Sequence, residues 1–458
     1  QNNRPAPNNP WFNAEPTHPF NVGYDMNHES TDTKKFVGRV TEHWLQEYKI
    51  DGFRFDLSKG FTQRNSGNNV NQWSAYDASR ITIWKGYYDT VQNKSSGAYV
   101  ILEHFAENSE EKELSDYSML LWGNMNYNYN EGSMGYVNNS DISGAIHTAR
   151  GWSNPHLVSY MESHDEERLM YKNLQFGNNT PNYNIKVLDT ALKRVELDAA
   201  FFFTIPGPKM LWHFGELGYD YSINNCTNGS ISDQCRLDPK PIRWDYFGDT
   251  RRRHLYNVFS SLIKLRFHPW YRDAFLSNRI EYSLNGAVKW IKLTTDTSNL
   301  LVVGNFDVAP QSATVTFQSA GTWYDYLNNS TFTTTGTAQN ISLRAGEYHV
   351  FTNRNVNNLA TTPVSNLPWS EATLAVRAYP NPVFSFFTVE VNLMQNSIVS
   401  IELINTAGQR ISMLHQAFMT KGKHQLILNR KTLPVPTGHY YLHMSTTAGD
   451  RTLSVTLE

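Results

Sequence analysis

The strongest constraint on the fold is a change of pattern near residue 280. Between residues 31 and 268, helix-like segments alternate with short apolar strands. This alternation predicts an α/β fold with a parallel sheet, because each helix returns the chain to the start of the next strand. Five strands are expected, in the sequences IDGFRFD, AYVILEH, MLLWGNMNYNY, LVSYMESHD and PKMLWHFGE.

After residue 280, short strand candidates separated by Gly, Asn, Asp and Ser replace the alternation. Residues 281–352 and residues 376–458 each have the pattern of a small antiparallel β-sandwich. Between them, residues 353–375 are rich in Asn, Thr, Ser and Pro and have no period, which is typical of a linker. We therefore expect an α/β domain over residues 31–280, followed by two β-sandwich domains.

Composition excludes two classes of partner. The 458 residues carry a formal net charge of -2 without a long run of one sign, so nothing attracts nucleic acid electrostatically. No stretch approaches the ~18–20 apolar residues that cross a bilayer, and the run AAFFFTIPG is broken by Pro206. We expect neither a nucleic-acid-binding protein nor an integral membrane protein.

The two cysteines, Cys226 and Cys235, lie close together in the polar loop NNCTNGSISDQCRLDPKP. Two thiols at this spacing can close a short disulfide in an oxidising compartment, and a reduced pair is the alternative. A metal site would need further Cys or His nearby, which this loop lacks. We predict a disulfide and assign no metal ligand.

Three carboxylates stand where strand candidates end. Asp56 follows GFRF, Glu103 follows YVIL and Asp165 follows SYMESH. In (β/α) barrels the catalytic groups come from these strand ends, because the following loops form the open rim of the barrel. Arg54 lies two residues before Asp56, on the same face of the strand, and its positive charge favours the ionised carboxylate.

Two facing carboxyl groups are the requirement of retaining glycoside hydrolysis, with one as nucleophile and the other as acid/base. Asp56 is the candidate nucleophile, and Glu103 is the candidate acid because neighbouring negative charge raises its pKa. Asp165, preceded by His164, is placed to bind sugar hydroxyls. The structural alternative is a simple ion pair of Arg54 with Asp56 and an ordinary strand-end carboxylate at Glu103.

Four sequence motifs carry a family resemblance. DGFRFDLSK, VILEHF and MESHD resemble, in order, the second, third and fourth sequence regions of the α-amylase family of glycoside hydrolases, family 13. IPGPKMLWHFGELGYD resembles the last barrel strand of that family, and GNFD, GTWYDYL and GEYHVF resemble the β-sandwich that follows its barrel. The resemblance extends from residue 10 to about residue 350.

This resemblance implies a (β/α)8 TIM-type barrel and a retaining α-amylase that cleaves internal α-1,4 bonds of starch. It assigns Asp56 as nucleophile, Glu103 as general acid/base and Asp165 as the acid that stabilises the transition state. The substrate ligands that it implies are Arg54, Lys59, His164 and the stacking ring of Trp122, although core packing is the alternative for Trp122. A transglycosylase or branching enzyme of the same family, or a non-catalytic glucan-binding surface protein, are the alternative functions.

The sequence departs from the family pattern in two respects. Residues 31–280 correspond to barrel strands 4 to 8, and residues 1–30 resemble part of the loop domain between strand 3 and helix 3, so the first three strands are expected to be missing. Gly60 follows Lys59 where many amylases carry a His that helps to bind calcium. No cofactor is expected for the chemistry, and a structural calcium ion is an expectation for the full-length protein only.

The C-terminal segment resembles a second family. AYPNPVFSFFTVEV, VSIELINTAGQRI and PTGHYYLHM are similar to the type A C-terminal sorting domain of the type IX secretion system in Bacteroidetes. This resemblance implies recognition by the secretion machinery and a secreted or cell-surface protein, which favours the disulfide between Cys226 and Cys235. A carbohydrate-binding or adhesive β-sandwich is the alternative.

Overall fold

The computed structural model describes residues 4–20, 23–356, 375–393, 395–406, 409–446 and 449–458. The chain divides into two compact units, Gln1–Asn366 and Leu367–Glu458. The predicted linker, residues 353–375, lies mostly outside the described residues.

The sheet that carries the candidate residues is parallel, as predicted. Its strands are adjacent in chain order: β1 (Gly52–Phe55), β2 (Tyr99–Leu102), β3 (Leu120–Asn124) and β4 (Leu157–Tyr160). The fifth predicted strand was wrong, because its only pairing among the described residues is one parallel bridge between Lys209 and Ser159. Pro206 and Pro208 precede that bridge and have no N–H to donate, which limits ladder formation. In the described part of the chain this sheet has four strands and is not closed into a barrel, so the (β/α)8-type barrel, expected here without its first three strands, stays a prediction.

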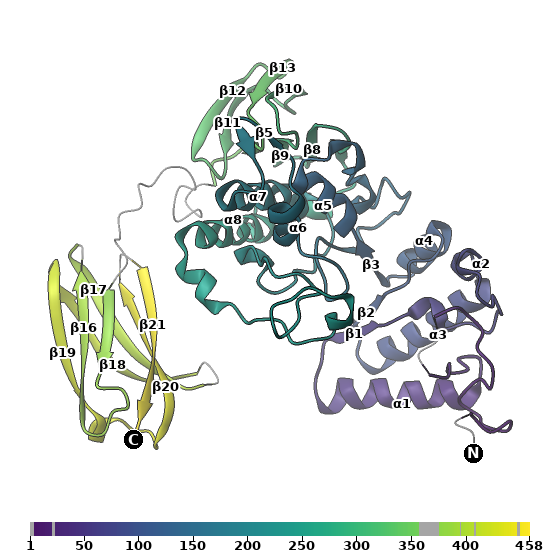
Figure 1. The fold of residues 1–458 in the computed structure, drawn as a ribbon, viewed down its shortest axis with the longest axis horizontal. Coiled ribbons are helices and arrows are strands. Elements are labelled where there is room, and N and C mark those ends of the chain that lie inside the picture. Colours follow the sequence, from purple (N-terminus) through teal and green to yellow (C-terminus); the bar gives the residue numbers. More distant parts are fainter. Residues whose placement is uncertain (1–3, 21–22, 357–374, 394, 407–408, 447–448) are drawn as a thin grey trace. The chain divides into compact units, whose positions relative to one another are not determined.

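One helix precedes the sheet, and the other helices come later in the chain (Figure 1). They are α1 (Thr31–Glu47), α2 (Val70–Ser74), α3 (Ala78–Lys94), α4 (Asn108–Asp116), α5 (Asn126–Met134), α6 (Leu169–Phe176), α7 (Leu188–Thr204) and α8 (Thr250–Phe267). Asp77 begins α3 by accepting hydrogen bonds from the N–H groups of Ser79 and Arg80, which removes two of the unpaired donors of the first turn. Trp84 of α3 is fully buried in the apolar cluster that also contains Val100 and Leu121 of the strands.

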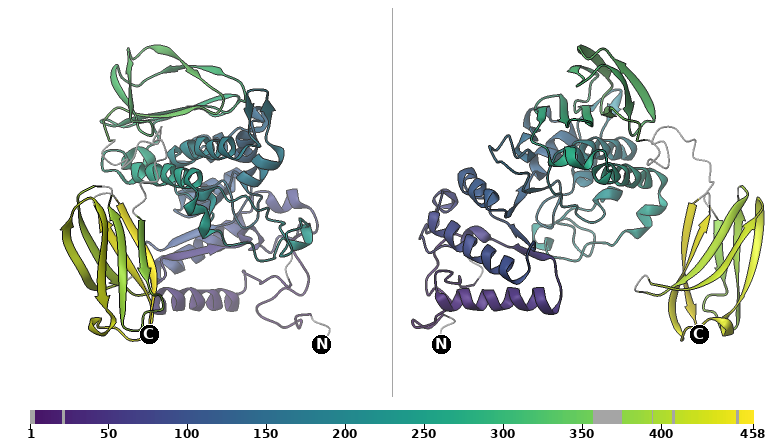
Figure 2. Two further views of the ribbon diagram at one scale, coloured as in Figure 1. Left: turned by 60° about the vertical axis from the view of Figure 1, so that its left-hand side comes forward. Right: turned by 180° about the vertical axis from the view of Figure 1, so that it is seen from behind.

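Helices α7 and α8 lie side by side and join the sheet to a β-sandwich (Figure 2). The run from Ala199 to Phe203 in α7 is buried on every side, as expected for a helix that is apolar all round. Its Phe201 ring lies 5.3 Å from that of Phe306, and the Arg194 guanidinium donates to the carbonyl of Phe306 at 2.6 Å. The sandwich is therefore fastened to the α/β part through α7.

The sandwich of the first unit has two antiparallel sheets. The larger contains β7 (Ile280–Ser283), β8 (Val288–Thr294), β9 (Asn299–Asn305), β11 (Gly321–Asp325), β12 (Ser330–Thr334) and β14 (Tyr348–Thr352). The smaller pairs β10 (Gln311–Thr316) with β13 (Ala338–Leu343). Val303, Val315 and Trp323 are buried between them. A short hairpin, β5 (Asn179–Thr180) with β6 (Tyr183–Asn184), completes the strands of this unit.

The second unit is also an antiparallel β-sandwich, as predicted. One sheet contains β15 (Ala375–Tyr379), β16 (Phe386–Leu393) and β19 (Gly422–Asn429), and the other contains β18 (Arg410–Met419), β17 (Ser397–Ile404), β20 (Gly438–Thr446) and β21 (Gly449–Leu457). Alternate residues of β16, namely Phe387, Val389 and Val391, point into the core.

Candidate active site

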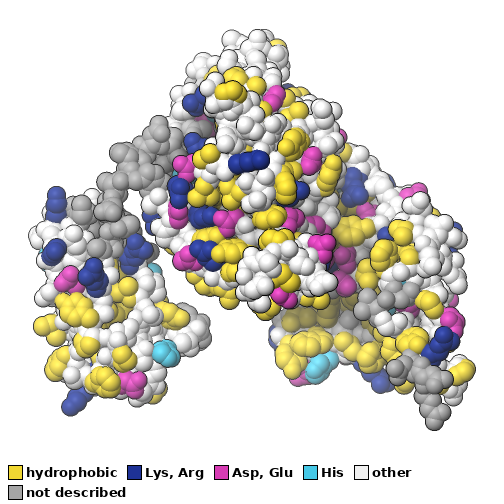
Figure 3. Space-filling view, viewed as in Figure 1, with side chains coloured by type: hydrophobic (Ala, Val, Ile, Leu, Met, Phe, Trp, Pro, Cys, Tyr) yellow, Lys and Arg dark blue, Asp and Glu magenta, His cyan; other side chains and the backbone are white. Residues whose placement is uncertain are grey.

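The register of β1 and β2 brings Asp56 and Glu103 together. Phe55 and Leu102 are paired across the two parallel strands, so the residues that follow them emerge side by side at the carboxyl edge of the sheet. The N–H of Glu103 donates to the carbonyl of Phe55 at 3.0 Å, which continues the pairing to the end of the strand. Figure 3 shows acidic side chains where the surface of this unit is hollowed between the part with α1–α4 and the part with α5–α8.

Arg54 bridges the two carboxyl groups. Its Nη1 donates to Oδ1 of Asp56 at 2.9 Å, and its Nη2 lies 3.3 Å from Oε1 of Glu103. The guanidinium also lies over the ring of Trp122, 5.0 Å from the ring centroid. Trp122 is buried, with 8% of its surface exposed, so the structure places its ring under Arg54 and not at a surface where a glucose ring could stack.

The surroundings shift the pKa values of Asp56 and Glu103 in opposite directions. Burial, helped by the neighbouring Asp56 carboxylate, raises the pKa of Glu103 to about 6, against the opposing effects of the Leu57 N–H and the Arg54 charge. Partial burial acts to raise the pKa of Asp56 as well, but hydrogen bonds from Arg54 and Glu103 and the charge of Arg54 lower that pKa overall. Below about pH 6, the favoured state of the pair is therefore an ionised Asp56 beside a protonated Glu103.

A strained turn after β1 holds this pair. Leu57 has φ 43°, a left-handed conformation that non-glycine residues seldom adopt. In that conformation its N–H donates to Oε2 of Glu103 at 2.9 Å. Ser58 then donates from both its N–H and its Oγ to the carbonyl of Glu103. The turn thus fixes both the carboxyl group of Glu103, through Leu57, and its backbone carbonyl, through Ser58.

Asp165 lies in the loop after β4 and has both carboxylate oxygens occupied. Nε2 of His164 is 3.0 Å from Oδ2, and Nη2 of Arg236 donates to Oδ1 at 3.0 Å. The charge of a protonated His164 also helps to lower the pKa of Asp56. Below them, Glu166 accepts hydrogen bonds from Asn124 at 2.6 Å and from the Tyr160 hydroxyl at 3.2 Å, which anchors the loop to β3 and β4.

Sequence reasoning missed Arg236. It lies 71 residues after Asp165, in a loop without periodicity, and the only signal near it is the preceding Cys235. In the structure Cys226 and Cys235 are joined in a disulfide.

Lys59 takes a different place from that expected of a substrate ligand. Its side chain is buried, and Nζ donates to Oγ of Ser74 at 2.9 Å and to the carbonyl of Phe105 at 3.0 Å. Nζ also lies 4.2 Å from the centroid of the Trp73 ring. The Lys59 side chain therefore makes its hydrogen bonds within the protein, where it joins the segment after β1 to the segment after β2.

The structural calcium ion expected for the full-length protein stays a prediction, and the one side-chain cluster of metal-binding type described here does not suit it. Among the described residues, the one group of three acidic, His or Cys side chains close enough for a metal is Cys226, Cys235 and Asp238. Both cysteines are in the disulfide, and calcium prefers oxygen ligands. At Gly60, the ring of His18 fills the adjacent space, with Nε2 2.8 Å from the place of a Cβ. No step of the chemistry below involves a metal.

Residues 377–456 match the family described as "Secretion system C-terminal sorting domain". This segment is a sorting domain of the type IX secretion system. It occupies the second unit, and it indicates a secreted or cell-surface protein. Among the described residues, no helix is both long enough and apolar enough to span a membrane.

For the first unit the comparison is structural. An Anoxybacillus α-amylase is similar with a TM-score of 0.53 and 16% identity, over 75% of this chain and 70% of that one. The α-amylase GTA of Geobacillus thermoleovorans, complexed with acarbose, has a TM-score of 0.53 and 14% identity over 75% and 71%. AmyP in complex with maltose has a TM-score of 0.51 and 14% identity over 79% and 73%. At these identities the likeness shows the fold of α-amylases. No match was found among curated protein sequences.

Proposed function

We propose that the first unit is a family 13 glycoside hydrolase, an α-amylase that cleaves internal α-1,4 bonds of starch and related α-glucans with retention of configuration. The observation that carries this proposal is the Asp56–Glu103 pair, adjacent at two strand ends and differing in protonation. The two carboxyl groups stand at paired strand ends and both contact the Arg54 guanidinium, which favours the close spacing of the retaining arrangement over the inverting one, where a water must fit between them. The structures solved with acarbose and maltose support an α-glucan as substrate.

In the first step, the Asp56 carboxylate attacks the anomeric carbon and forms a glycosyl ester, while Glu103 gives its proton to the leaving glycosidic oxygen. In the second step, Glu103 accepts a proton from water, and the resulting hydroxide displaces Asp56 from the sugar. Arg54 holds the nucleophile ionised through its 2.9 Å hydrogen bond. Asp165 and His164 would contact the hydroxyl groups of the sugar and stabilise the positive charge that develops at the anomeric carbon.

The test is release of reducing ends from soluble starch by the purified chain. Asp56→Asn should lose activity by at least about 10⁴-fold, because an amide is not a nucleophile here. Asp51→Asn is the matched control, because Asp51 is an exposed residue at the opposite end of β1 and should behave as wild type. Nuclear magnetic resonance of the first product should show the α anomer.

Three results would contradict the proposal. Full activity of Asp56→Asn would remove the nucleophile assignment. Chain rearrangement without net reducing ends would indicate a transglycosylase or branching enzyme. Starch binding by oxidised wild type without any turnover would indicate a glucan-binding protein.

A further inference from the structure

A loop between the Lys209 bridge and helix α8 contacts the candidate site. We call residues 222–240 the cystine loop. At its start, Oγ of Ser222 and N–H of Ile223 donate to the Glu167 carboxylate at 2.6 Å and 2.9 Å. Further along, Nη2 of Arg236 donates to Asp165, at 2.6 Å to the carbonyl and 3.0 Å to Oδ1. The cystine loop is therefore tied twice to the segment that carries Asp165.

The disulfide determines the shape of this loop. Regular pairing within it is limited to one bridge between Asn225 and Ile231 and one 3₁₀ turn, Asp233–Cys235. The Cys226–Cys235 link joins the two halves, and Arg236 follows the second cysteine directly. Closing a loop covalently removes most of its alternative conformations. The disulfide therefore restricts the backbone conformation at Arg236 before its side chain pairs with Asp165.

Lys240 strengthens the same arrangement. Its Nζ lies within hydrogen-bond distance of four carbonyl groups of the loop, those of Asn225 at 3.0 Å, Cys235 at 2.7 Å, Arg236 at 3.4 Å and Asp238 at 2.9 Å. Three of these carbonyls lie next to or on a cysteine of the disulfide. Opening the disulfide would thus also release the acceptors that hold Lys240.

The Arg236–Asp165 pair needs this support. Its side chains are 45% and 44% exposed, and an exposed ion pair contributes at most about 1 kcal/mol because ordering the arginine opposes it. A fixed backbone lowers that ordering cost, so the contact persists. The guanidinium then holds Asp165 on the side opposite His164.

We propose that Arg236 is a positioning residue for Asp165, and that the Cys226–Cys235 disulfide keeps Arg236 in place, so that the site is complete only in the oxidised protein. This inference rests on the proposed function of the site. Because the sorting domain indicates export, the disulfide would form outside the reducing cytoplasm. The enzyme would therefore gain full activity on leaving the cell.

The first test measures starch hydrolysis by wild type, Arg236→Ala, Arg236→Lys and Cys226→Ser/Cys235→Ser. Arg236→Ala should lower kcat about a hundredfold with little change in KM, as for a displaced reactive group. Arg236→Lys should recover part of kcat, because it restores the charge but not the planar fork. The double serine variant should resemble Arg236→Ala.

Treatment with a dithiol distinguishes the loss of the disulfide from other causes of a lowered kcat. Two electrons and two protons pass from the dithiol to the cystine, which leaves two cysteine thiols and the dithiol as a disulfide. Wild type should then fall to the kcat of the double serine variant, while Arg236→Ala should not fall further. The proposal would be overturned if the dithiol lowered kcat of Arg236→Ala as much as kcat of wild type. It would also be overturned if kcat of wild type stayed unchanged after titration had shown both thiols to be free.

A second readout is independent of catalysis. Trypsin cleaves after arginine, and Leu237, the residue after Arg236, is 94% exposed. Reduction, or Asp165→Asn in the oxidised protein, should speed cleavage after Arg236 severalfold. Accelerated cleavage in a protein without starch hydrolysis would contradict the proposed function but retain the coupling of the loop. Hydrolysis with unchanged cleavage and no response to the dithiol would overturn the coupling alone.

Discussion

Two consecutive residues after β2, Glu103 and His104, belong to two different clusters of charged and polar side chains. The two clusters differ in how completely their polar groups are paired. Glu103 belongs to the candidate site with Arg54 and Asp56, whereas His104 joins Arg80 and Glu110. In the second cluster all three side chains are at most 1% exposed, while in the first the values are 25% for Arg54, 67% for Asp56 and 13% for Glu103.

The buried cluster has its polar groups paired. Nε and Nη2 of Arg80 donate to the two oxygens of Glu110 at 2.6 Å and 2.7 Å, and Nη1 donates to the carbonyls of Lys59 and Trp73. In the described part of the chain, Arg54, by contrast, has Nε without a hydrogen bond, and its Nη2 meets Glu103 only as a 3.3 Å ion pair. Buried polar groups are normally paired, so the incomplete cluster is the one that has room for a ligand.

Among changes that compare the two clusters, Glu103→Gln should produce the largest effect, and it should act on catalysis alone. The amide cannot supply the proton to the leaving oxygen, so kcat on starch should fall by about 10² to 10⁴. The free energy of unfolding should change by about 0.5 kcal/mol or less, because the site is partly exposed. A large loss of stability, measured by urea unfolding, would mean that Glu103 is a structural residue.

Glu110→Gln is the matched change in the buried cluster, and it should act on stability. The substitution leaves the Arg80 charge buried and unpaired, which costs about 3–5 kcal/mol. The urea midpoint of the first unit should drop, while kcat per folded molecule changes little. A loss of kcat with an unchanged midpoint would contradict the structural role.

The Asp56–Glu103 pair was predictable because its determinants are local. Alternation in GFRF and YVIL identifies two strands, and residues directly after parallel strands meet at one edge. The antiparallel sandwiches were predictable for the same reason, from short strands and turn residues.

Other features depend on contacts that have no sequence period. The buried ammonium group of Lys59 donates hydrogen bonds to Ser74 and to the carbonyl of Phe105. No sequence pattern identifies either residue as its partner. The contact of Arg236 with Asp165 joins two irregular loops. The predicted fifth strand contained apolar residues, but prolines left it with a single bridge.

The dependence of kcat/KM on pH should show the difference between the pKa values of Asp56 and Glu103. Glu103 must be protonated in the free enzyme, so kcat/KM should be high below its pKa of about 6 and fall about tenfold per unit above it. The acidic limb should lie below the ordinary range of an aspartate, because the pKa of Asp56 is lowered. Constant kcat/KM from pH 5 to pH 8 would contradict the assignment of Glu103 as the acid.

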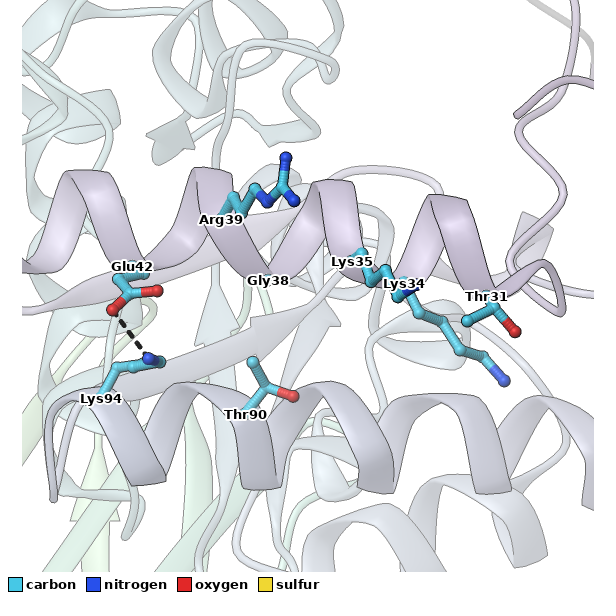
Figure 4. A pocket seen from close by; sticks show the side chains of 8 residues that line it. All are labelled: Thr31, Lys34, Lys35, Gly38, Arg39, Glu42, Thr90 and Lys94. Atoms are coloured by element: carbon cyan, nitrogen blue, oxygen red, sulfur yellow. Dashed lines mark hydrogen bonds and ion pairs between the residues drawn. The ribbon is translucent and has the colours of Figure 1, made fainter. Parts of the chain in front are cut away.

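The smallest effect is expected at an exposed pair between helices. Glu42 of α1 and Lys94 of α3 face each other across a shallow groove, with Oε1 2.7 Å from Nζ (Figure 4). Both side chains are 36% exposed, so water and salt screen their attraction, in contrast to the Arg80–Glu110 pair. Glu42→Ala should lower the free energy of unfolding by about 0.5 kcal/mol or less, and less again in high salt. A double-mutant cycle with Lys94→Ala measures the coupling, and a coupling above about 2 kcal/mol would show that burial is not what separates strong from weak pairs in this protein.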